Sequence, residues 1–320
     1  MPARAGLLIP LDGIPMPEHG PVLRQLSELG YGEVWTGEGG AFDAVVPLAA
    51  AAAWAPQLHI AAGVLPVYTR GPAVLAMTAA TLAELAPGRV TFGIGAGSPV
   101  VVEAWNAATY ADPFGRVRDT LRFLRAALAG ERVDKHYDTF EIRAFRLQHP
   151  PAVPPILLVG ALRPRMLALA AEEADGATVT WCPPDQAARM AEAFHSRGGG
   201  RLVASLAVCP STDVEEVRRR ARPIIAAYLT VPAYAAFQRW LGRGPQLGAM
   251  WEAWGRGDRA AALAAIPDAA VDDFIISGTP EQCRRRLDEY LAAGFTDTVV
   301  NLYPLIGDPL EAVRRLAPRR

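Results

Sequence analysis

The feature that most constrains the fold of this chain is a repeated alternation between two kinds of segment. Short apolar runs of strand length are followed by longer stretches rich in Ala, Leu and Arg with helical spacing. Strands that are apolar on both faces are typical of a parallel sheet covered by helices. Eight such runs are present: Ala5–Leu11, Gly32–Gly37, His59–Leu65, Val90–Gly95, Pro155–Gly160, Ala177–Cys182, Leu202–Cys209 and Thr298–Tyr303.

Helices are predicted between these strands, and local start signals support several of them. The segment Thr279-Pro280-Glu281-Gln282 combines an N-cap hydroxyl, a proline at the first helical position and a Gln that can complete a capping box. Asp213 with Glu216 offers a similar start. The predicted helices are Glu18–Leu29, Asp43–Trp54, Pro72–Leu85, Arg116–Ala129, Pro164–Glu173, Pro184–Ser196, Pro280–Ala293 and about Asp308–Leu316.

Eight strands with intervening helices favour a (β/α)8 barrel of the TIM type, although a doubly wound sheet fits the same alternation. One domain over residues 1–320 is expected, because no Ser/Gly linker or charge block divides the chain. Two segments break the alternation. Arg132–Leu147 is typical of a hairpin, and Tyr228–Ile266 is a long helical insertion after the seventh strand, rich in Trp and Tyr. Its length predicts a lid or an interface.

Composition excludes several classes of partner. The 32 basic residues nearly balance the 33 acidic ones, so a polybasic surface for nucleic acid is not expected. No apolar run reaches the roughly 18–20 residues of a membrane span, and Met1–Pro10 lacks the pattern of a signal peptide. The histidines show no metal-ligand spacing, so no metal is expected. Three widely spaced cysteines without a CxxC motif favour a reducing, cytoplasmic location.

Polar groups follow the predicted second and third strands, where the ligands of parallel barrels bind. Glu38 lies beside three glycines and could accept hydrogen bonds from a ligand. It could equally pair with an Arg, while Asp43 caps the next helix. Tyr68 and Arg70 could line a site or belong to a structured turn.

Two further strand ends are candidates for ligand binding. Gly93-Ile94-Gly95-Ala96-Gly97-Ser98 does not complete a dinucleotide fingerprint, and it more safely indicates backbone exposed to a flat or anionic ligand. At Gly160-Ala161-Leu162-Arg163-Pro164-Arg165, a helix start meets two arginines, which favours a phosphate site over a solvated Arg pair. Cys182 is interpreted as a buried, inert thiol at a strand end.

Taken together, these strand ends resemble the luciferase-like monooxygenase superfamily, in particular its branch that uses the deazaflavin coenzyme F420. The resembling stretches are YGEVWTGEGGAFD (31–43), GVLPVYTRGPAVLAMTAATLAELAPGRVTFGIGAGSP (63–99), PPILLVGALRPRMLALAAEEADGA (154–177) and SGTPEQCRRRLDEYLAAG (277–294). The resemblance implies a TIM-type barrel, usually a homodimer, with the cofactor ring at the carboxyl mouth.

The resemblance also implies roles for particular residues. Glu38 would be the catalytic residue near the ring and would bind the cofactor together with Gly39. Gly63-Val64 would form a non-proline cis peptide against the ring face, and Leu65 would also bind the cofactor. Contacts with the ring edge or ribityl chain would come from Ala96, Gly97 and Ser98, and the phosphate would be held by Gly160, Ala161, Leu162 and Arg163.

Gly39 departs from the family pattern, because many relatives have His at this position. Glu38, Tyr68 or a substrate group could take over proton transfer, or the reaction may need none. The leading hypothesis is an F420-dependent oxidoreductase that transfers a hydride to or from a small, fairly apolar substrate, with the Trp/Tyr-rich insertion as a lid. The alternatives are an FMN-dependent monooxygenase that uses molecular oxygen and a relative without catalytic activity.

Overall fold

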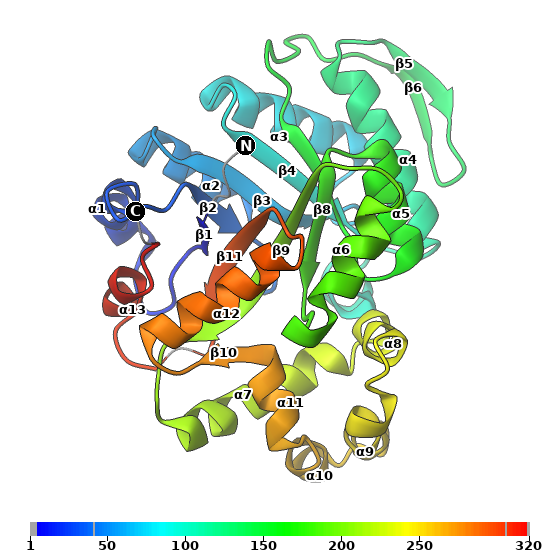
Figure 1. Ribbon diagram of the computed structural model, residues 1–320. Coiled ribbons are helices and arrows are strands. Elements are labelled where there is room, and N and C mark those ends of the chain that lie inside the picture. The colour runs from blue at the N-terminus through cyan, green and yellow to red at the C-terminus, as the bar shows by residue number, and fades with distance from the viewer. Residues whose placement is uncertain (1–4, 41, 305, 319–320) are drawn as a thin grey trace.

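Eight parallel strands close into a barrel in the computed structural model, which describes residues 5–40, 42–304 and 306–318 (Figure 1). Pairing of β8 with β9 and of β11 with β1 completes the ring, so the predicted (β/α)8 barrel is confirmed and an open sheet is excluded. In order around the barrel, the strands are β1 (Ala5–Leu8), β2 (Glu33–Thr36), β3 (His59–Pro66), β4 (Val90–Gly95), β7 (Ile156–Gly160), β8 (Gly176–Thr180), β9 (Arg201–Cys209) and β11 (Asp297–Leu302).

Helices pack around the outside of the barrel, and most of its apolar core lies between them and the strands (Figure 1). The capping box predicted at Thr279 is present, with Thr279 and Gln282 each bonding the other's backbone amide. The outer helices are α1 (His19–Leu26), α2 (Val45–Trp54), α3 (Pro72–Leu85), α4 (Pro113–Leu128), α5 (Pro164–Glu173), α6 (Ala187–His195), α12 (Pro280–Ala292) and α13 (Pro309–Arg315).

Some helix starts differ from the prediction for local reasons. The fourth helix starts at Pro113 instead of Arg116, because Asp112 accepts a hydrogen bond from the Gly115 amide at 3.0 Å and caps it. The segment predicted from Pro184 begins as a 3₁₀ turn (η3, Pro184–Gln186) before α6. After β4 the chain forms a π-helix (η2, Val100–Trp105), and a further 3₁₀ turn (η1, Met16–Glu18) precedes α1.

Both predicted excursions from the alternation are present. The hairpin consists of β5 (Val133–His136) and β6 (Glu141–Phe145). The insertion after β9 is longer than residues 228–266, because helices extend it at both ends. Its elements are α7 (Val214–Leu229), α8 (Pro232–Trp240), α9 (Gly244–Gly255), α10 (Arg259–Ala264), α11 (Asp268–Phe274) and β10 (Ile275–Ser277), a short strand paired with β9.

A buried polar network closes the barrel at the amino ends of its strands. The Arg201 guanidinium contacts Glu33 at 2.8 Å and Asp297 at 3.1 Å, and it donates to Thr91 Oγ1 at 3.0 Å. Trp35 above it donates to Glu33 and packs with Ala61, Leu158, Val203 and Val299. Charges this deeply buried are tolerated only when they are paired and hydrogen-bonded, and these are.

No helix in the described ranges is long and apolar enough to cross a membrane. The stretch Met1–Pro10 was expected to carry no signal peptide, and its first four residues lie outside the described part of the chain.

Candidate active site

A large cavity opens at the carboxyl ends of the barrel strands. Its volume is about 1410 Å³, and every barrel strand contributes to its walls, either through its last residues or through the residues that follow it. Ligands of parallel barrels bind at this end, because the loops that vary without disturbing the barrel gather there. The cavity brings together eleven of the predicted site residues: Glu38, Gly39, Gly63, Val64, Ala96, Gly97, Ser98, Gly160, Ala161, Leu162 and Arg163.

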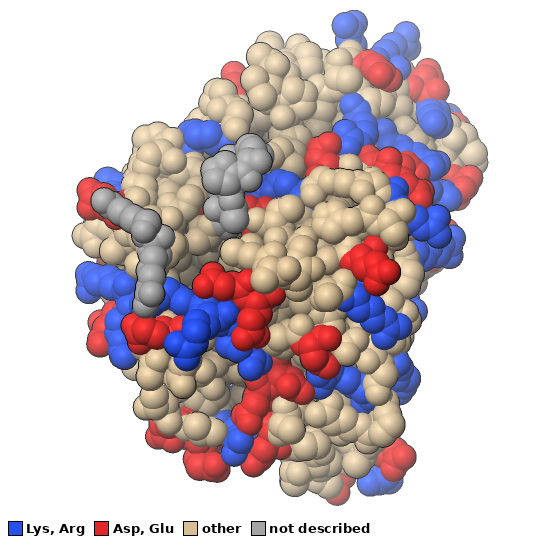
Figure 2. Space-filling model, viewed as in Figure 1, with Lys and Arg blue, Asp and Glu red and all other residues tan. Residues whose placement is uncertain are grey.

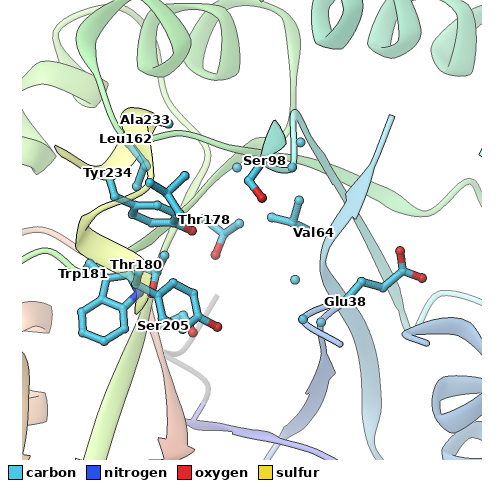
Figure 3. Close-up of a pocket in the computed structure, with 18 of the residues that line it drawn as sticks. Glu38, Val64, Ser98, Leu162, Thr178, Thr180, Trp181, Ser205, Ala233 and Tyr234 are labelled. Carbon is cyan, nitrogen blue, oxygen red and sulfur yellow. The ribbon is translucent and has the colours of Figure 1, made fainter. Parts of the chain in front are cut away.

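Val64 lines the cavity near Ser98 (Figure 3). The apolar surface that it forms beside Gly95 and Gly160 is called the Val64 floor. These two glycines make room for the Val64 side chain. A Cβ at Gly95 would lie 2.5 Å from Val64 Cγ1, and one at Gly160 would lie 2.8 Å from Val64 Cγ2. The glycines after β4 and β7 therefore admit a neighbouring side chain, which gives the cavity a smooth, uncharged base.

Two expectations about this part of β3 are wrong. Leu65 does not line the cavity; it is fully buried in the core between barrel and helices. The Gly63–Val64 bond is not cis, since the cis bonds among the described residues precede Pro10 and Pro304. A β-bulge explains the position of Leu65, and a trans bond at Gly63 is the ordinary state of a non-proline peptide. The register with β4 shifts between Ala62 and Leu65, so Gly63 and Val64 both face the cavity and Leu65 turns outward.

Glu38 lies at the cavity rim, with its carboxylate turned away from the open centre (Figure 3). Arg70 Nη1 contacts Glu38 Oε1 at 2.5 Å, and the Ala44 amide donates to the same oxygen at 3.4 Å. Asp43 accepts from the first amides of α2. The geometry therefore favours the interpretation in which Glu38 pairs with an Arg and Asp43 caps the helix.

Tyr68 and Arg70 do not line the cavity. The Tyr68 hydroxyl donates to the Ala111 carbonyl at 2.5 Å, and its ring packs against Tyr110 with centroids 5.2 Å apart. Arg70 binds Glu38 and approaches Asp43 at 3.8 Å. Both side chains hold loops around the mouth together.

The start of α5 faces the cavity and has features of an anion site. Arg163 is its N-cap residue, no side chain caps the helix, and Arg163, Pro164, Arg165 and Met166 line the cavity. Arg165 stacks on the Phe114 ring at 3.8 Å. Among the described residues, no carboxylate forms an ion pair with Arg163. Pro164 has no amide hydrogen, and the Met166 amide donates to the Arg163 carbonyl at 3.0 Å, so the Arg165 amide and the exposed Arg163 guanidinium are the groups at this helix start that are suited to binding a phosphate.

Sequence reasoning missed a group of polar side chains inside the barrel mouth. Thr178, Thr180, Ser205 and Asn301 line the cavity, and none makes a side-chain hydrogen bond within the described part of the chain. Strand periodicity could have revealed Thr178 and Thr180, because the polar residues of β8 alternate with the core residues Ala177 and Val179.

The wall opposite Glu38 is aromatic and comes largely from the insertion. Tyr228, Tyr234, Trp240 and Trp254 line the cavity together with Trp181, which follows β8. Trp181 and Tyr234 are on this wall in Figure 3. Another aromatic residue of the insertion, Trp251, does not line the cavity and donates to the Leu229 carbonyl at 2.8 Å.

Cys182 also borders the cavity, but it is only 4% exposed. Its thiol donates to the Pro183 carbonyl at 3.6 Å. Within the described ranges, no three His, Cys, Asp or Glu side chains gather in a way that could hold a metal ion. The charged groups at the mouth of the barrel therefore belong to individual Arg, Asp and Glu side chains.

Comparison with known proteins agrees with this arrangement. The profile of the family described as luciferase-like monooxygenase matches residues 5–297. The chain belongs to the luciferase-like monooxygenase family. The match spans seven of the eight barrel strands and ends at the first residue of β11, so the family and most of the fold are supported by the same residues.

Several relatives of this luciferase-like protein are named for coenzyme F420 or act on pterins. A Mycobacterium tuberculosis protein named as a coenzyme F420-dependent oxidoreductase is 27% identical, covering 89% of this chain and 91% of its own. The 5,10-methylenetetrahydromethanopterin reductase of Archaeoglobus fulgidus is 29% identical over 76% of each chain. The F420-dependent tetrahydromethanopterin reductase of Methanopyrus kandleri shares the fold with a TM-score of 0.80, at 18% identity over 99% of this chain and 98% of its own.

Proposed function

We propose that this protein is a coenzyme F420-dependent oxidoreductase that transfers a hydride between the deazaflavin and a small, fairly apolar organic substrate. The observation that carries the proposal is the combination of the Val64 floor with the open start of α5 in one cavity. The names of the two relatives that match most of this chain support the same cofactor or the same class of reaction.

The cavity residues fit this cofactor. A flat ring needs an apolar surface without protruding side chains, which the Val64 floor with Gly95 and Gly160 offers. A phosphate needs a backbone amide and a cation, which α5 and Arg163 offer. Thr178, Thr180 and Ser205 carry free hydroxyls for polar ring or ribityl atoms. The aromatic wall suits an apolar substrate and excludes water.

When bound, the reduced deazaflavin supplies the hydride, and the protein contributes binding and orientation. The proposed catalytic role of Glu38 rests on its place at the end of β2. Its pair with Arg70 supports an indirect contribution, in which the carboxylate fixes the loop that carries Gly39.

Replacement of Arg163 tests the proposal. We expect Arg163→Ala to weaken F420 binding by about 10- to 100-fold, because a hydrogen bond to a charged group contributes about 1.5–3 kcal/mol. Turnover at saturating cofactor should change much less, because a phosphate contact is equal in the ground and transition states. Equilibrium titration with oxidised F420 and single-turnover rates would measure the two effects.

Arg143→Ala is the matched control, because it removes the same charge from the exposed hairpin, where Arg143 pairs with Glu141. An unchanged dissociation constant for Arg163→Ala would remove Arg163 from the site. Tight binding of reduced FMN without affinity for F420 would favour the monooxygenase alternative. Binding of F420 without oxidation of its reduced form by any substrate would favour a non-catalytic relative.

We also propose that the protein forms a homodimer through α2 and α3, which pack side by side. Helix α2 contains no charged residue, and α3 contains only Glu84. Exposed apolar side chains on these helices include Val46 (65% exposed), Val74 (47%) and Met77 (47%). Val74, Met77, Thr81 and Leu85 form one stripe along α3, and an apolar patch of this kind is suited to a second copy of the chain.

Small molecules, and not nucleic acids, are the proposed ligands. On the face seen in Figure 2, acidic and basic side chains are interspersed, most densely over α12 and α13. Such a surface lacks the single-sign field that binds polyanions. A cytoplasmic location is proposed because the three cysteines are buried and free.

A further inference from the structure

The structure assigns Tyr228 as the proton donor of the cavity, acting on the carbonyl oxygen of a ketone, an aldehyde or an enone as the hydride adds to carbon. This inference rests on the proposed function and names its substrate class. The sequence offers two protein groups for proton transfer, Glu38 and Tyr68, but both are engaged elsewhere in the structure. Glu38 binds Arg70, and the Tyr68 hydroxyl donates to Ala111 outside the cavity.

Tyr228 approaches the same loop from the opposite wall. It is the penultimate residue of α7 and lines the cavity. A Cβ placed on Gly39 would lie 3.8 Å from Tyr228 Oη, with no other atom within 4 Å except those of its chain neighbours. Because Gly39 has no side chain, the phenol hydroxyl faces open space across the mouth of the barrel.

Neighbouring rings fix the orientation of the phenol. Trp181 packs against it with centroids 4.9 Å apart and planes at 37°, and Tyr234 meets it edge-on at 5.8 Å. Trp181 itself is held in an uncommon backbone conformation, with φ at +56°, and its carbonyl accepts from the Gln238 amide at 2.8 Å. Strained residues of this kind persist where the surroundings enforce them, often beside functional groups.

The Tyr228 hydroxyl is available to a ligand, because it makes no hydrogen bond within the described residues. Burial raises the pKa of the phenol, so the group keeps its proton at neutral pH and acts as a donor. When a ligand enters, a partly buried phenol without a protein acceptor loses its hydrogen bond to water. A carbonyl oxygen in the cavity would replace that hydrogen bond.

The proposed step balances in atoms and electrons. The hydride forms a new C–H bond at the carbonyl carbon while the electron pair of the C=O π bond moves to oxygen. Tyr228 transfers its proton to that oxygen, which gives an alcohol, or the enol when the hydride adds to an enone at the β-carbon. The phenolate then takes a proton from water at the cavity mouth, and the substrate is reduced by two electrons.

Tyr228→Phe tests the inference, with Tyr137→Phe as the matched control, because Tyr137 packs against Phe140 in the hairpin and does not line the cavity. We expect Tyr228→Phe to slow the oxidation of reduced F420 by acetophenone by about 100-fold or more, as for loss of a general acid. Its dissociation constant for F420 should stay within a factor of about three. Tyr137→Phe should retain most of the wild-type rate. Tyr234→Phe, which removes another phenol of the cavity wall, is used only in the binding measurement below.

A second measurement does not depend on turnover. The infrared carbonyl stretch of acetophenone, labelled with ¹³C at the carbonyl, would be recorded when it is bound to the protein with oxidised F420 and without cofactor. We expect a shift to lower frequency in the wild type and in Tyr234→Phe, and loss of this shift in Tyr228→Phe.

The inference would be overturned by an unshifted stretch in the wild type, by the same shift in Tyr228→Phe, or by loss of the shift in Tyr234→Phe alone. Failure of the wild type to bind F420 is a separate result. It would count against the proposed function, while the stretch in the cofactor-free protein would still decide the role of Tyr228.

Discussion

The three cysteines are residues whose chemistry is set by their surroundings. Burial raises the pKa of Cys182 to about 12 and those of Cys209 and Cys283 to about 11. Because the thiolate is the reactive form, thiols with such pKa values remain neutral and unreactive at pH 8. We expect iodoacetamide at pH 8 to modify less than one thiol per native chain and all three after unfolding in guanidinium, as measured by intact mass. Rapid alkylation of native Cys182 would mean that the cavity exposes this thiol.

Glu38 and Tyr228 illustrate which site residues the sequence could reveal. A carboxylate after a strand and beside glycines is a local pattern, so Glu38 was found, but its partner Arg70 comes from the next strand end and decides where the carboxylate points. Tyr228 was noticed only as one aromatic residue of the insertion. Its closeness to Gly39 depends on how α7 returns to the barrel, which no local spacing encodes.

Strands β3, β4 and β7 depend on one another through Val64, and this coupling can be measured. We expect Gly160→Ala to destabilise the fold by about 1–3 kcal/mol, because its Cβ would lie 2.8 Å from Val64 Cγ2 and overpack the site. Val64→Ala removes that atom, so the double variant should recover part of the loss, with a coupling of at least about 0.5 kcal/mol. Urea unfolding of the four proteins would provide the cycle.

Gly248→Ala is the matched control for this experiment. It lies within α9, and a Cβ there would meet no atom within 4 Å, so the substitution should be neutral or slightly stabilising. Strictly additive effects of Gly160→Ala and Val64→Ala would show that the clash is relieved by movement of the backbone.

Elements with local signals were predicted well, and those set by tertiary contacts were not. The start of α12 follows from a capping box within four residues, and it is present as expected. The bulge in β3 depends on pairing with β4, so the outward turn of Leu65 could not be derived from the sequence. The cis bond expected at Gly63 came from the family resemblance, and the trans bond that is present is the ordinary state of a non-proline peptide. Likewise, α8, α9 and α10 are predicted only as one helical segment over residues 228–266, and α11 lies outside that segment.

At the scale of the whole molecule, the proposed dimer can be tested by placing negative charges on the exposed face of α3. We expect the wild type to sediment as a dimer and the double variant Val74→Glu, Met77→Glu to sediment as a monomer, because both side chains lie on the exposed stripe of α3. Val153→Glu, at an equally exposed apolar residue far from this helix in sequence, should remain dimeric. Analytical ultracentrifugation at several concentrations would measure the assembly, and a dimeric α3 double variant would place the contact elsewhere.

The Arg201 network limits where ligands can enter the barrel. Arg201, Glu33 and Asp297 block the amino end of the barrel, so the cavity is closed at that end. Molecules therefore enter and leave the cavity at the carboxyl end only. A molecule resting on the floor must then arrive before, and depart after, any molecule that covers it. For the proposed function, we therefore expect compulsory-order binding in steady-state kinetics, with the cofactor bound before the substrate.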